Sequence, residues 1–269
     1  YFNKTTNKKI LMFLPLMIWL LTATILIRTS NIPSLKNAAT GDWELGPDLD
    51  PYLFLRNALE ISENKNMGKL DMMRYSPIGA SSYIHNSLMP WAILGVYEIV
   101  KIFSSNVSIT YAAIIAPVIF FVLSLVSFFF FVYVLFSFKF SKEKSFLGAT
   151  IASFFYSFVP AMLHRTIAGI PELESLGMIS FWMSFLFFAL AWKQEKIAKQ
   201  VLFGTLAGLF TGIMAWSWGG YRYIYMILAF ATLLAFLFNI KPKKNLMIFA
   251  PFTIVGILIE MIKTPISSI

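Results

Sequence analysis

The chain has 269 residues, of which 58% are apolar and 17% aromatic, and its formal net charge is +9. A mean hydropathy of +0.72 leaves too little polar surface for a soluble domain of this length, so the composition predicts a polytopic membrane protein. The absence of cysteine excludes disulfides, zinc–thiolate sites and cysteine catalysis. Because the basic residues lie in short loops between apolar runs, the positive charge does not indicate a nucleic-acid partner.

Seven apolar runs are long enough to cross a bilayer, whose hydrocarbon core is ~30 Å thick. The first follows three lysines and is expected to be a retained membrane anchor, because it is too long for a cleavable signal. A long, mostly polar segment separates it from the others. The runs lie at about residues 10–27, 107–138, 145–162, 175–192, 201–216, 222–239 and 246–262.

Lysines gather in three connectors between these runs, at residues 139–144, 193–199 and 241–244. If the N-terminus is cytoplasmic, all three connectors are cytoplasmic. Together with Lys4, Lys8 and Lys9 they then carry 12 of the 22 Lys and Arg residues and two of the 13 acids. This asymmetry agrees with the positive-inside rule.

Two segments are therefore predicted to be external loops, residues 28–106 and residues 163–174. Within the first loop, residues 88–103 are apolar but short, and they include Glu98 and Lys101. We expect this segment to be an amphipathic helix at the outer surface, because an additional span would place all three lysine-rich connectors outside.

Acidic residues of the predicted external face gather in two segments far apart in the sequence. Residues 41–52 contain Asp50, and residues 164–174 contain Glu172 and Glu174. Carboxylates at a membrane boundary cost desolvation energy unless they are paired or bind a cation. Mg²⁺ and Mn²⁺ take oxygen ligands, often one or two carboxylates plus substrate phosphates. The three acids are candidate ligands of such an ion, although a solvated loop explains any single one of them equally well.

Four short motifs occur in a characteristic order. The first, residues 50–56, reads Asp-Pro-Tyr-Leu-Phe-Leu-Arg, and residues 74–79 read Arg-Tyr-Ser-Pro-Ile-Gly. Residues 165–174 read Arg-Thr-Ile-Ala-Gly-Ile-Pro-Glu-Leu-Glu, and residues 216–221 read Trp-Ser-Trp-Gly-Gly-Tyr. Together they resemble the motifs of the oligosaccharyltransferase catalytic subunits, archaeal and eukaryotic enzymes that move a lipid-linked glycan onto asparagine.

The resemblance implies an all-α polytopic membrane protein with a GT-C-type glycosyltransferase domain over residues 1–269. It implies that Asp50, Glu172 and Glu174 bind Mn²⁺ or Mg²⁺ and that Asp50 also contacts the acceptor asparagine. Arg165 would hold these carboxylates in place, so Asp50, Arg165 and Glu172 are the expected catalytic residues. The implied substrates are a lipid-linked oligosaccharide and a protein with an Asn-x-Ser/Thr sequon.

Five further residues are candidate substrate contacts. Arg222 is placed to touch a phosphate, or to anchor a helix end. The aromatic residues near it form either a stacking platform or an interfacial belt, and the belt is the simpler interpretation. The five candidates are Arg74, Tyr75, Trp218, Tyr221 and Arg222.

The chain departs from the family pattern in two ways. Glu172 stands where the family more often has Asp. The later acidic external loop and the C-terminal soluble domain of the family have no counterpart here, so the chain is expected to be an N-terminal portion that is inactive alone. Its composition and the sequence of its second acidic motif resemble those of archaeal members. These act as single subunits in the plasma membrane, with the active site on the outer face. A eukaryotic origin would imply the ER membrane and a luminal face.

Three alternatives stay open. A related enzyme that uses a lipid-phosphate monosaccharide also predicts an early external Asp, but neither the Arg-Thr-x-Ala-Gly loop nor the Trp-Gly-Gly-Tyr turn. A transporter predicts ionisable residues near the middle of the membrane, whereas the centres of these spans are nearly free of charge. A nonenzymatic scaffold subunit is the third.

Overall fold

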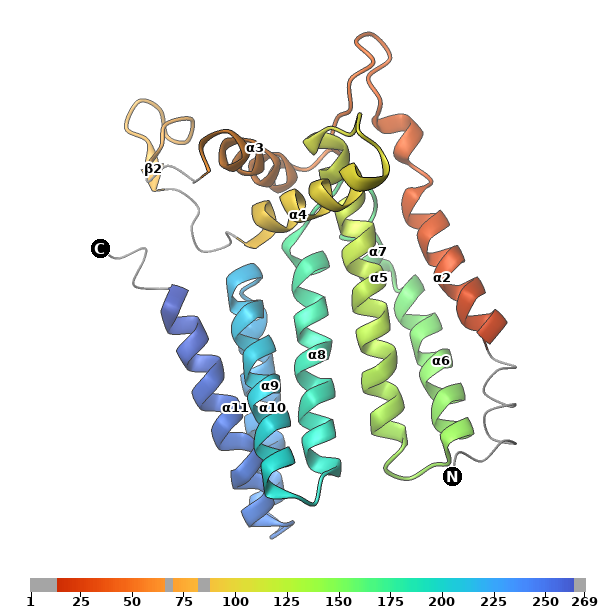
Figure 1. Ribbon diagram of the computed structural model, residues 1–269, viewed down its shortest axis with the longest axis vertical. Helices are drawn as coiled ribbons and strands as arrows, with labels where there is room; N and C mark the ends of the chain where they lie inside the picture. The colour runs from red at the N-terminus through yellow and green to blue at the C-terminus, as the bar shows by residue number, and fades with distance from the viewer. Residues whose placement is uncertain (1–13, 66–69, 82–87, 264–269) are drawn as a thin grey trace.

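The computed structural model describes residues 14–65, 70–81 and 88–263, and Lys4, Lys8 and Lys9 lie outside this part. The described chain is almost entirely helical (Figure 1). In chain order its elements are α2 (Leu14–Thr29), η1 (Ile32–Leu35), α3 (Leu49–Asn64), β1 (Leu70–Asp71), β2 (Ala80–Ser81), α4 (Leu88–Phe103), α5 (Ile109–Phe136), α6 (Lys142–Phe158), α7 (Pro160–His164), α8 (Leu173–Lys193), α9 (Ile197–Ser217), α10 (Tyr221–Leu237) and α11 (Pro242–Lys263).

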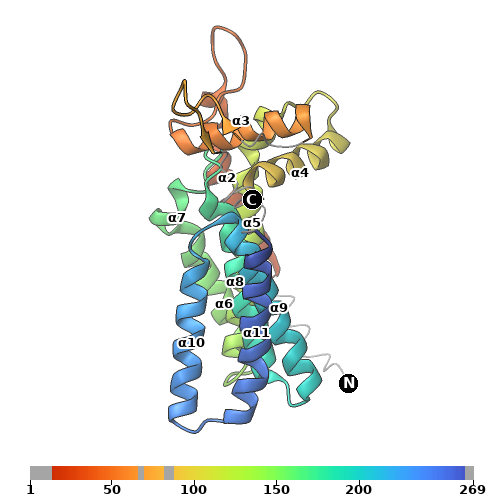
Figure 2. The same ribbon diagram turned by 90° about the vertical axis from the view of Figure 1, so that its left-hand side faces the viewer.

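The long helices run side by side as a bundle, with α10 on one side of it (Figure 2). Within the part of the chain that the structure describes, five segments are long and apolar enough to cross a membrane, which confirms a multi-pass membrane protein. They are Pro15–Leu35, Ile109–Phe136, Leu173–Lys193, Ile197–Ser217 and Pro242–Ile262. Helices α6 and α10 each have 17 residues and fall short of that length, so seven spans stay a prediction.

Helix α9 packs closely on α11 because glycines remove side chains from their contact. A Cβ on Gly208 would lie 2.3 Å from the carbonyl oxygen of Phe252, and one on Gly204 would lie 2.6 Å from that of Ile248. Small residues of this kind let helix backbones approach each other in membranes, where apolar burial gives little driving force.

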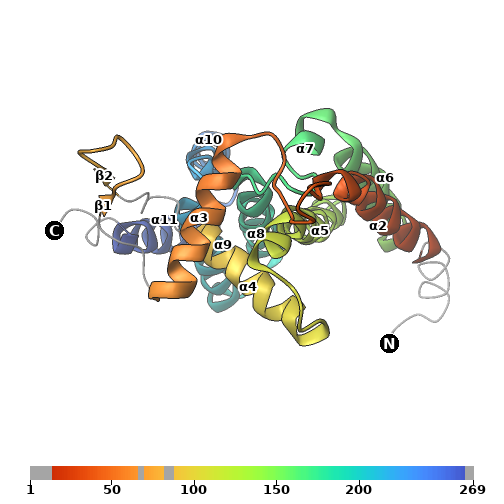
Figure 3. The ribbon, with the colours of Figure 1, turned by 90° about the horizontal axis from the view of Figure 1, so that it is seen from above.

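Helices α3 and α4 lie across one end of the bundle (Figure 3). Phe54 of α3 and Met89 and Ile93 of α4 are buried in one apolar cluster with Ala113 of α5. On the opposite side of α4, Trp91 and Ile102 are exposed. The sequence predicted an amphipathic helix for residues 88–103, and a helix with these bounds is present; its place on the membrane surface stays a prediction.

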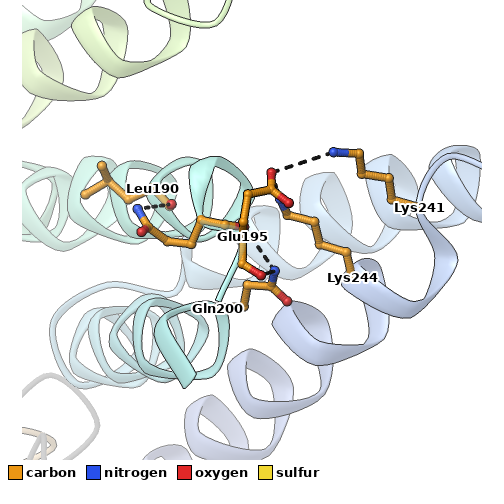
Figure 4. A network of polar contacts seen from close by, with 6 residues as sticks. Leu190, Glu195, Gln200, Lys241 and Lys244 are labelled. Atoms are coloured by element: carbon orange, nitrogen blue, oxygen red, sulfur yellow. Dashed lines mark hydrogen bonds and ion pairs between the residues drawn. The ribbon is translucent and has the colours of Figure 1, made fainter. Parts of the chain in front are cut away.

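The lysine-rich connectors lie at the opposite end of the bundle (Figure 1). Glu195, between α8 and α9, pairs there with Lys244 at 3.3 Å and with Lys241 at 3.8 Å (Figure 4). The hydrogen bond from Lys244 and the charges of both lysines lower the pKa of Glu195. These ion pairs join the connector between α8 and α9 to the connector between α10 and α11. The two connectors therefore lie at the same end of the bundle, as the charge pattern predicts.

Candidate active site

The segment that links α7 to α8 contains the second acidic motif. Arg165 follows the last residue of α7, and Glu172 immediately precedes the first residue of α8. Between them the backbone turns at Gly169, whose φ of +86° is a conformation that L side chains rarely adopt. Residues 165–172 therefore form a short, sharply turned connection whose two ends present opposite charges.

Three backbone hydrogen bonds fasten this segment to parts of the chain that are distant in sequence. Ala168 N–H donates to the carbonyl of Arg28, at the end of α2, at 2.8 Å. Gly169 N–H donates to the carbonyl of Ile114 in α5 at 2.9 Å. Gly46 N–H, from the first acidic segment, donates to the carbonyl of Gly169 at 2.8 Å. The two acidic segments, more than a hundred residues apart, thus meet at one end of the bundle.

Two glycines make this approach possible. A Cβ on Gly169 would lie 2.6 Å from Cδ1 of Leu35 and 3.1 Å from the backbone nitrogen of Gly46. A Cβ on Gly46 would lie 2.9 Å from Cγ1 of Ile170. Contacts below 3 Å force neighbouring atoms to move, so the glycines of both motifs serve the contact between them.

The Glu172 carboxylate is the buried charge of the site. Its side chain is 4% exposed, and Oε1 lies 2.9 Å from Nη1 of Arg165. Burial raises the pKa of Glu172 to about 7, against the lowering effect of Arg165; the nearby acids Glu174 and Asp48 raise it further. Asp48 and Glu172, from different segments, are thus close enough for the charge of one to raise the pKa of the other. Three acids from two segments therefore act on one another, with one arginine to balance them.

The chemistry of these residues fits a hard divalent cation. Glu172 Oε1 is buried and, among the described residues, accepts no hydrogen bond, because the N–H groups of Arg165 are not directed at it although Nη1 lies only 2.9 Å away. One or two carboxylates plus substrate phosphates are a common arrangement for Mg²⁺. In the part of the chain that the structure describes, no group of three acids or histidines is close enough to hold a metal. Asp48 and Glu172 could supply two protein ligands.

Comparison with known proteins decides the family. The family model described as oligosaccharyl transferase STT3, N-terminal, matches residues 39–267. The chain belongs to this family. The matched region of this STT3 family member includes both acidic segments, α7 and the turn between α9 and α10.

Two curated relatives of this STT3 family member are similar in sequence. The dolichyl-phosphooligosaccharide-protein glycotransferase of Methanococcus voltae is 27% identical over 202 residues, which cover 70% of this chain and 21% of that protein. The STT3 subunit of the Saccharomyces cerevisiae dolichyl-diphosphooligosaccharide–protein glycosyltransferase is 24% identical over 126 residues, or 46% and 17% of the two chains. The matches thus span about a fifth of the length of these relatives.

Solved structures of the Archaeoglobus fulgidus oligosaccharyltransferase share the fold of this STT3 chain. One is tethered to an acceptor peptide containing the NVT sequon; it superposes with a TM-score of 0.74 at 20% identity, over 92% of this chain and 29% of that one. Another, in complex with an inhibitory peptide and a dolichol-phosphate, gives a TM-score of 0.73 with the same identity and coverage. The likeness confirms the helical membrane fold.

The predicted catalytic residues of this STT3 chain lie in different surroundings. Arg165 and Glu172 form an ion pair. Asp50 is exposed in the first turn of α3. Asp48 precedes α3, accepts the Leu49 N–H at 2.7 Å, and is the acid of the first segment that raises the pKa of Glu172. The set Asp50, Glu172 and Glu174 as metal ligands stays a prediction.

The turn between α9 and α10 packs against the start of α8. A Cβ on Gly177 would lie 2.9 Å from Cβ of Trp218, so this tryptophan covers α8 near the end where Glu172 lies. The hydroxyl of Tyr221 donates to Glu260 of α11, and the Arg222 guanidinium lies 5.4 Å from the Tyr221 ring. The Trp-Gly-Gly-Tyr motif therefore joins three helices close to the acidic segments.

The other two predicted substrate contacts lie in the antiparallel hairpin formed by β1 and β2. Arg74 and Tyr75 are in the turn between β1 and β2, and Tyr75 is 77% exposed. An ion pair between Arg56 of α3 and Asp71 of β1 fastens this hairpin to α3. A role of either residue in substrate binding stays a prediction.

Sequence reasoning missed two residues of this region. Asp48 was part of the quoted acidic segment, and its position at the start of a helix, where aspartate is a preferred N-cap, was an available signal. Glu260 is an acid inside the last apolar run, which by itself indicates a functional or partnered residue. Its partner Tyr221 is on another helix, and no local pattern pointed to it.

Proposed function

We propose that this chain is the membrane-embedded catalytic part of an enzyme that transfers a preassembled oligosaccharide from a dolichyl phosphate or pyrophosphate carrier to asparagine in protein sequons. The observation that carries the proposal is the hydrogen bond from Gly46 N to Gly169 O, which brings the two acidic segments together. Relatives of the same family are glycotransferases, and a protein with this fold takes a dolichol-phosphate and a sequon peptide.

In this proposal each polar group of the site has one task. Asp50, exposed at the start of α3, accepts a hydrogen bond from the acceptor amide and orients its nitrogen toward the sugar. Arg165 holds the Glu172 carboxylate in place and favours its charged form against the effect of burial, because a charge-assisted contact stabilises the ionised carboxylate. The asparagine nitrogen bonds to the anomeric carbon and loses a proton, and the bond from that carbon to the carrier oxygen breaks.

A divalent cation, Mn²⁺ or Mg²⁺, belongs to the proposal. Asp48 and Glu172 would hold it, with Asp50 and Glu174 as the further ligands that the family resemblance implies. When bound, the ion supplies Lewis-acid stabilisation for the departing phosphate or pyrophosphate. The buried Oε1 of Glu172, which accepts no hydrogen bond within the described residues, supports this assignment.

We further propose that α6 and α10 also cross the membrane, which gives seven spans. The lysine-rich connectors would then be cytoplasmic, and α3, α4 and the acidic segments would face outward. The resemblance to archaeal members favours a single-subunit enzyme of the plasma membrane. Because the chain matches about a fifth of its curated relatives, we assign transfer to the intact protein and expect residues 1–269 alone to be inactive.

The test is glycan transfer by the intact protein with Asp50→Ala. The assay follows conversion of a sequon peptide to glycopeptide by mass spectrometry, with a lipid-linked oligosaccharide as donor. Asp42→Asn is the control, because Asp42 is an exposed acid of the same loop. We expect Asp50→Ala to abolish transfer and the control to retain it; unchanged transfer by Asp50→Ala would remove the proposed role of this residue.

A further inference from the structure

Arg28, in the last turn of α2, is fully buried although its side chain is permanently charged. Its guanidinium carbon lies 3.6 Å from the centroid of the Phe121 ring, which is a cation–π contact. Within the described residues no carboxylate pairs with Arg28, and its Nη1 and Nη2 atoms have no hydrogen-bond partner. A buried charge without a counter-ion is costly, so its presence indicates a role other than stability.

The groups of Arg28 that do have partners all contact the segment with the second acidic motif or the ring beneath it. The side-chain Nε–H donates to Oγ1 of Thr166 at 2.8 Å. The backbone carbonyl accepts the Ala168 N–H at 2.8 Å. This carbonyl is at the end of a helix, where it has no partner within the helix. Arg28 therefore fixes the two residues on either side of Ile167.

Thr166 is the residue that transmits this contact. It is fully buried and directly follows Arg165, whose guanidinium faces Glu172. Its hydroxyl also donates to the carbonyl of Met162 in α7 at 2.5 Å, so its oxygen has both a donor and an acceptor partner. The orientation of the hydroxyl is thereby fixed, and the chain that leads into Arg165 is held between α2 and α7.

We propose that Arg28 is a positioning residue for glycan transfer, which holds residues 165–172 through Thr166 and Ala168 so that Arg165 faces Glu172. The inference rests on the function proposed above. The Arg28 side chain is buried and, among the described residues, forms no ion pair with Glu172 or Asp48. It therefore acts through residues 165–172. Its planar guanidinium stacks on Phe121 and directs Nε–H at the same time, which a lysine cannot do.

The experiment compares Thr166→Val with Thr29→Val in the intact protein. Valine keeps the shape of threonine and removes the hydroxyl. Among the described residues, the Thr29 hydroxyl bonds only to carbonyls of its own helix, so Thr29→Val is the matched control. Thr166→Ser keeps the hydroxyl, and Arg28→Lys keeps the charge without the stacked Nε–H. Rates at saturating lipid-linked oligosaccharide give kcat, and its concentration dependence gives KM.

We expect Thr166→Val and Arg28→Lys to lower kcat about 10- to 100-fold, as removal of outer partners of a polar site does, with KM unchanged. Thr166→Ser should restore kcat, and the double variant Arg28→Lys, Thr166→Val should be no slower than the slower single variant, because both changes break one contact. Wild-type kcat in Thr166→Val, or failure of Thr166→Ser to restore it, would overturn the proposal.

Amide hydrogen exchange provides a second readout that does not depend on activity. The amides of Ala168 and Gly169 should exchange faster in Thr166→Val and at the wild-type rate in Thr29→Val. If the unsubstituted protein transfers no glycan, the proposed function fails, and these amides still decide whether Arg28 holds the segment. Unchanged exchange in Thr166→Val would contradict the positioning role. If Arg28→Lys does not fold, Thr166→Val decides alone.

Discussion

The backbone N–H of Gly46 donates a 2.8 Å hydrogen bond to the carbonyl of Gly169. This bond joins the loop before α3 to the loop before α8, and the acid at the end of the first loop, Asp48, raises the pKa of the acid at the end of the second, Glu172. Because neither glycine has room for a Cβ, the chemistry of the site depends on two residues that have no functional group. The account therefore makes predictions for the glycines as well as for the acids.

Replacing Gly169 by alanine should impair both folding and transfer. Gly169 and Gly41 both have positive φ, +86° and +78°, so alanine at either position costs about 1–2 kcal/mol of backbone strain. Only at Gly169 does the new Cβ also meet Leu35 and the Gly46 backbone; Gly41 has nothing within 4 Å. Thermal unfolding in detergent should therefore show a larger drop for Gly169→Ala than for Gly41→Ala. Equal drops in unfolding temperature for the two variants would show that backbone strain accounts for the loss of stability and that the contacts of the new Cβ with Leu35 and Gly46 do not contribute.

Replacing Arg165 by alanine should lower the rate of glycan transfer in a protein that still folds. Arg165 is partly exposed while Glu172 is buried, so Arg165→Ala leaves a carboxylate without its counter-charge. We expect a rate loss of about 10- to 100-fold, typical of removing a partner that orients a polar site. Arg165→Lys should recover part of the rate. Steady-state transfer assays check this, and a wild-type rate in Arg165→Ala would contradict the assigned role.

The raised pKa of Glu172 predicts a pH dependence of stability. Its pKa rises from 4.5 to about 7 in the folded protein, mainly through burial, so the folded state holds a proton that the unfolded chain releases. The stabilisation from this group is complete below pH 4.5 and is lost as the pH rises through about 7. Unfolding temperatures measured in detergent with EDTA, from about pH 5 to about pH 8, should fall with pH.

The control for this slope is Glu172→Gln, which cannot titrate and should flatten it. Added Mn²⁺ should raise the unfolding temperature at high pH in the unsubstituted protein, because a ligand that binds only the folded state stabilises it. The same ion should have a smaller effect on Glu172→Gln. An identical pH slope in both proteins would show that Glu172 is not the titrating group.

The placement of the two bundle ends can be tested with single cysteines, since the chain has none. Thr40 is exposed in the loop before α3, and Ser141 is exposed at the start of α6. In intact cells a membrane-impermeant thiol reagent should label Thr40→Cys and not Ser141→Cys. Labelling of Ser141→Cys from outside would overturn the predicted topology and place the acidic segments in the cytoplasm.

The sequence predicted the elements of the fold better than it predicted the contacts of the site. Runs of apolar residues and lysine-rich connectors identified the helices of the bundle, because length and charge act locally. The same reasoning selected Asp50, whose catalytic role stays a prediction, and it did not indicate that Asp48 acts on the pKa of Glu172. The proximity of Asp48 to Glu172 depends on how the chain enters α3 and on the Gly46–Gly169 bond.

The partner of Glu260 and the partner of Arg28 could not be predicted for a related reason. Tyr221 and Glu260 are 39 residues apart on different helices, and Arg28 and Thr166 are 138 residues apart. Contacts at such separations follow from helix packing, which a single sequence does not encode in any local spacing. The resemblance to a known family supplied the roles of the acids and named Tyr221 as a candidate substrate contact, but it gave no role to Arg28, Thr166 or Glu260.

The central claim is that Glu172, held beside Asp48 and Arg165, belongs to the centre of glycan transfer. The most direct measurement is glycopeptide formation by the intact protein carrying Glu172→Gln, with Glu44→Gln as the control, an exposed acid of the neighbouring loop. The account predicts that Glu172→Gln folds but loses transfer, whereas the control folds and retains it. Transfer by Glu172→Gln at the rate of the control would contradict it.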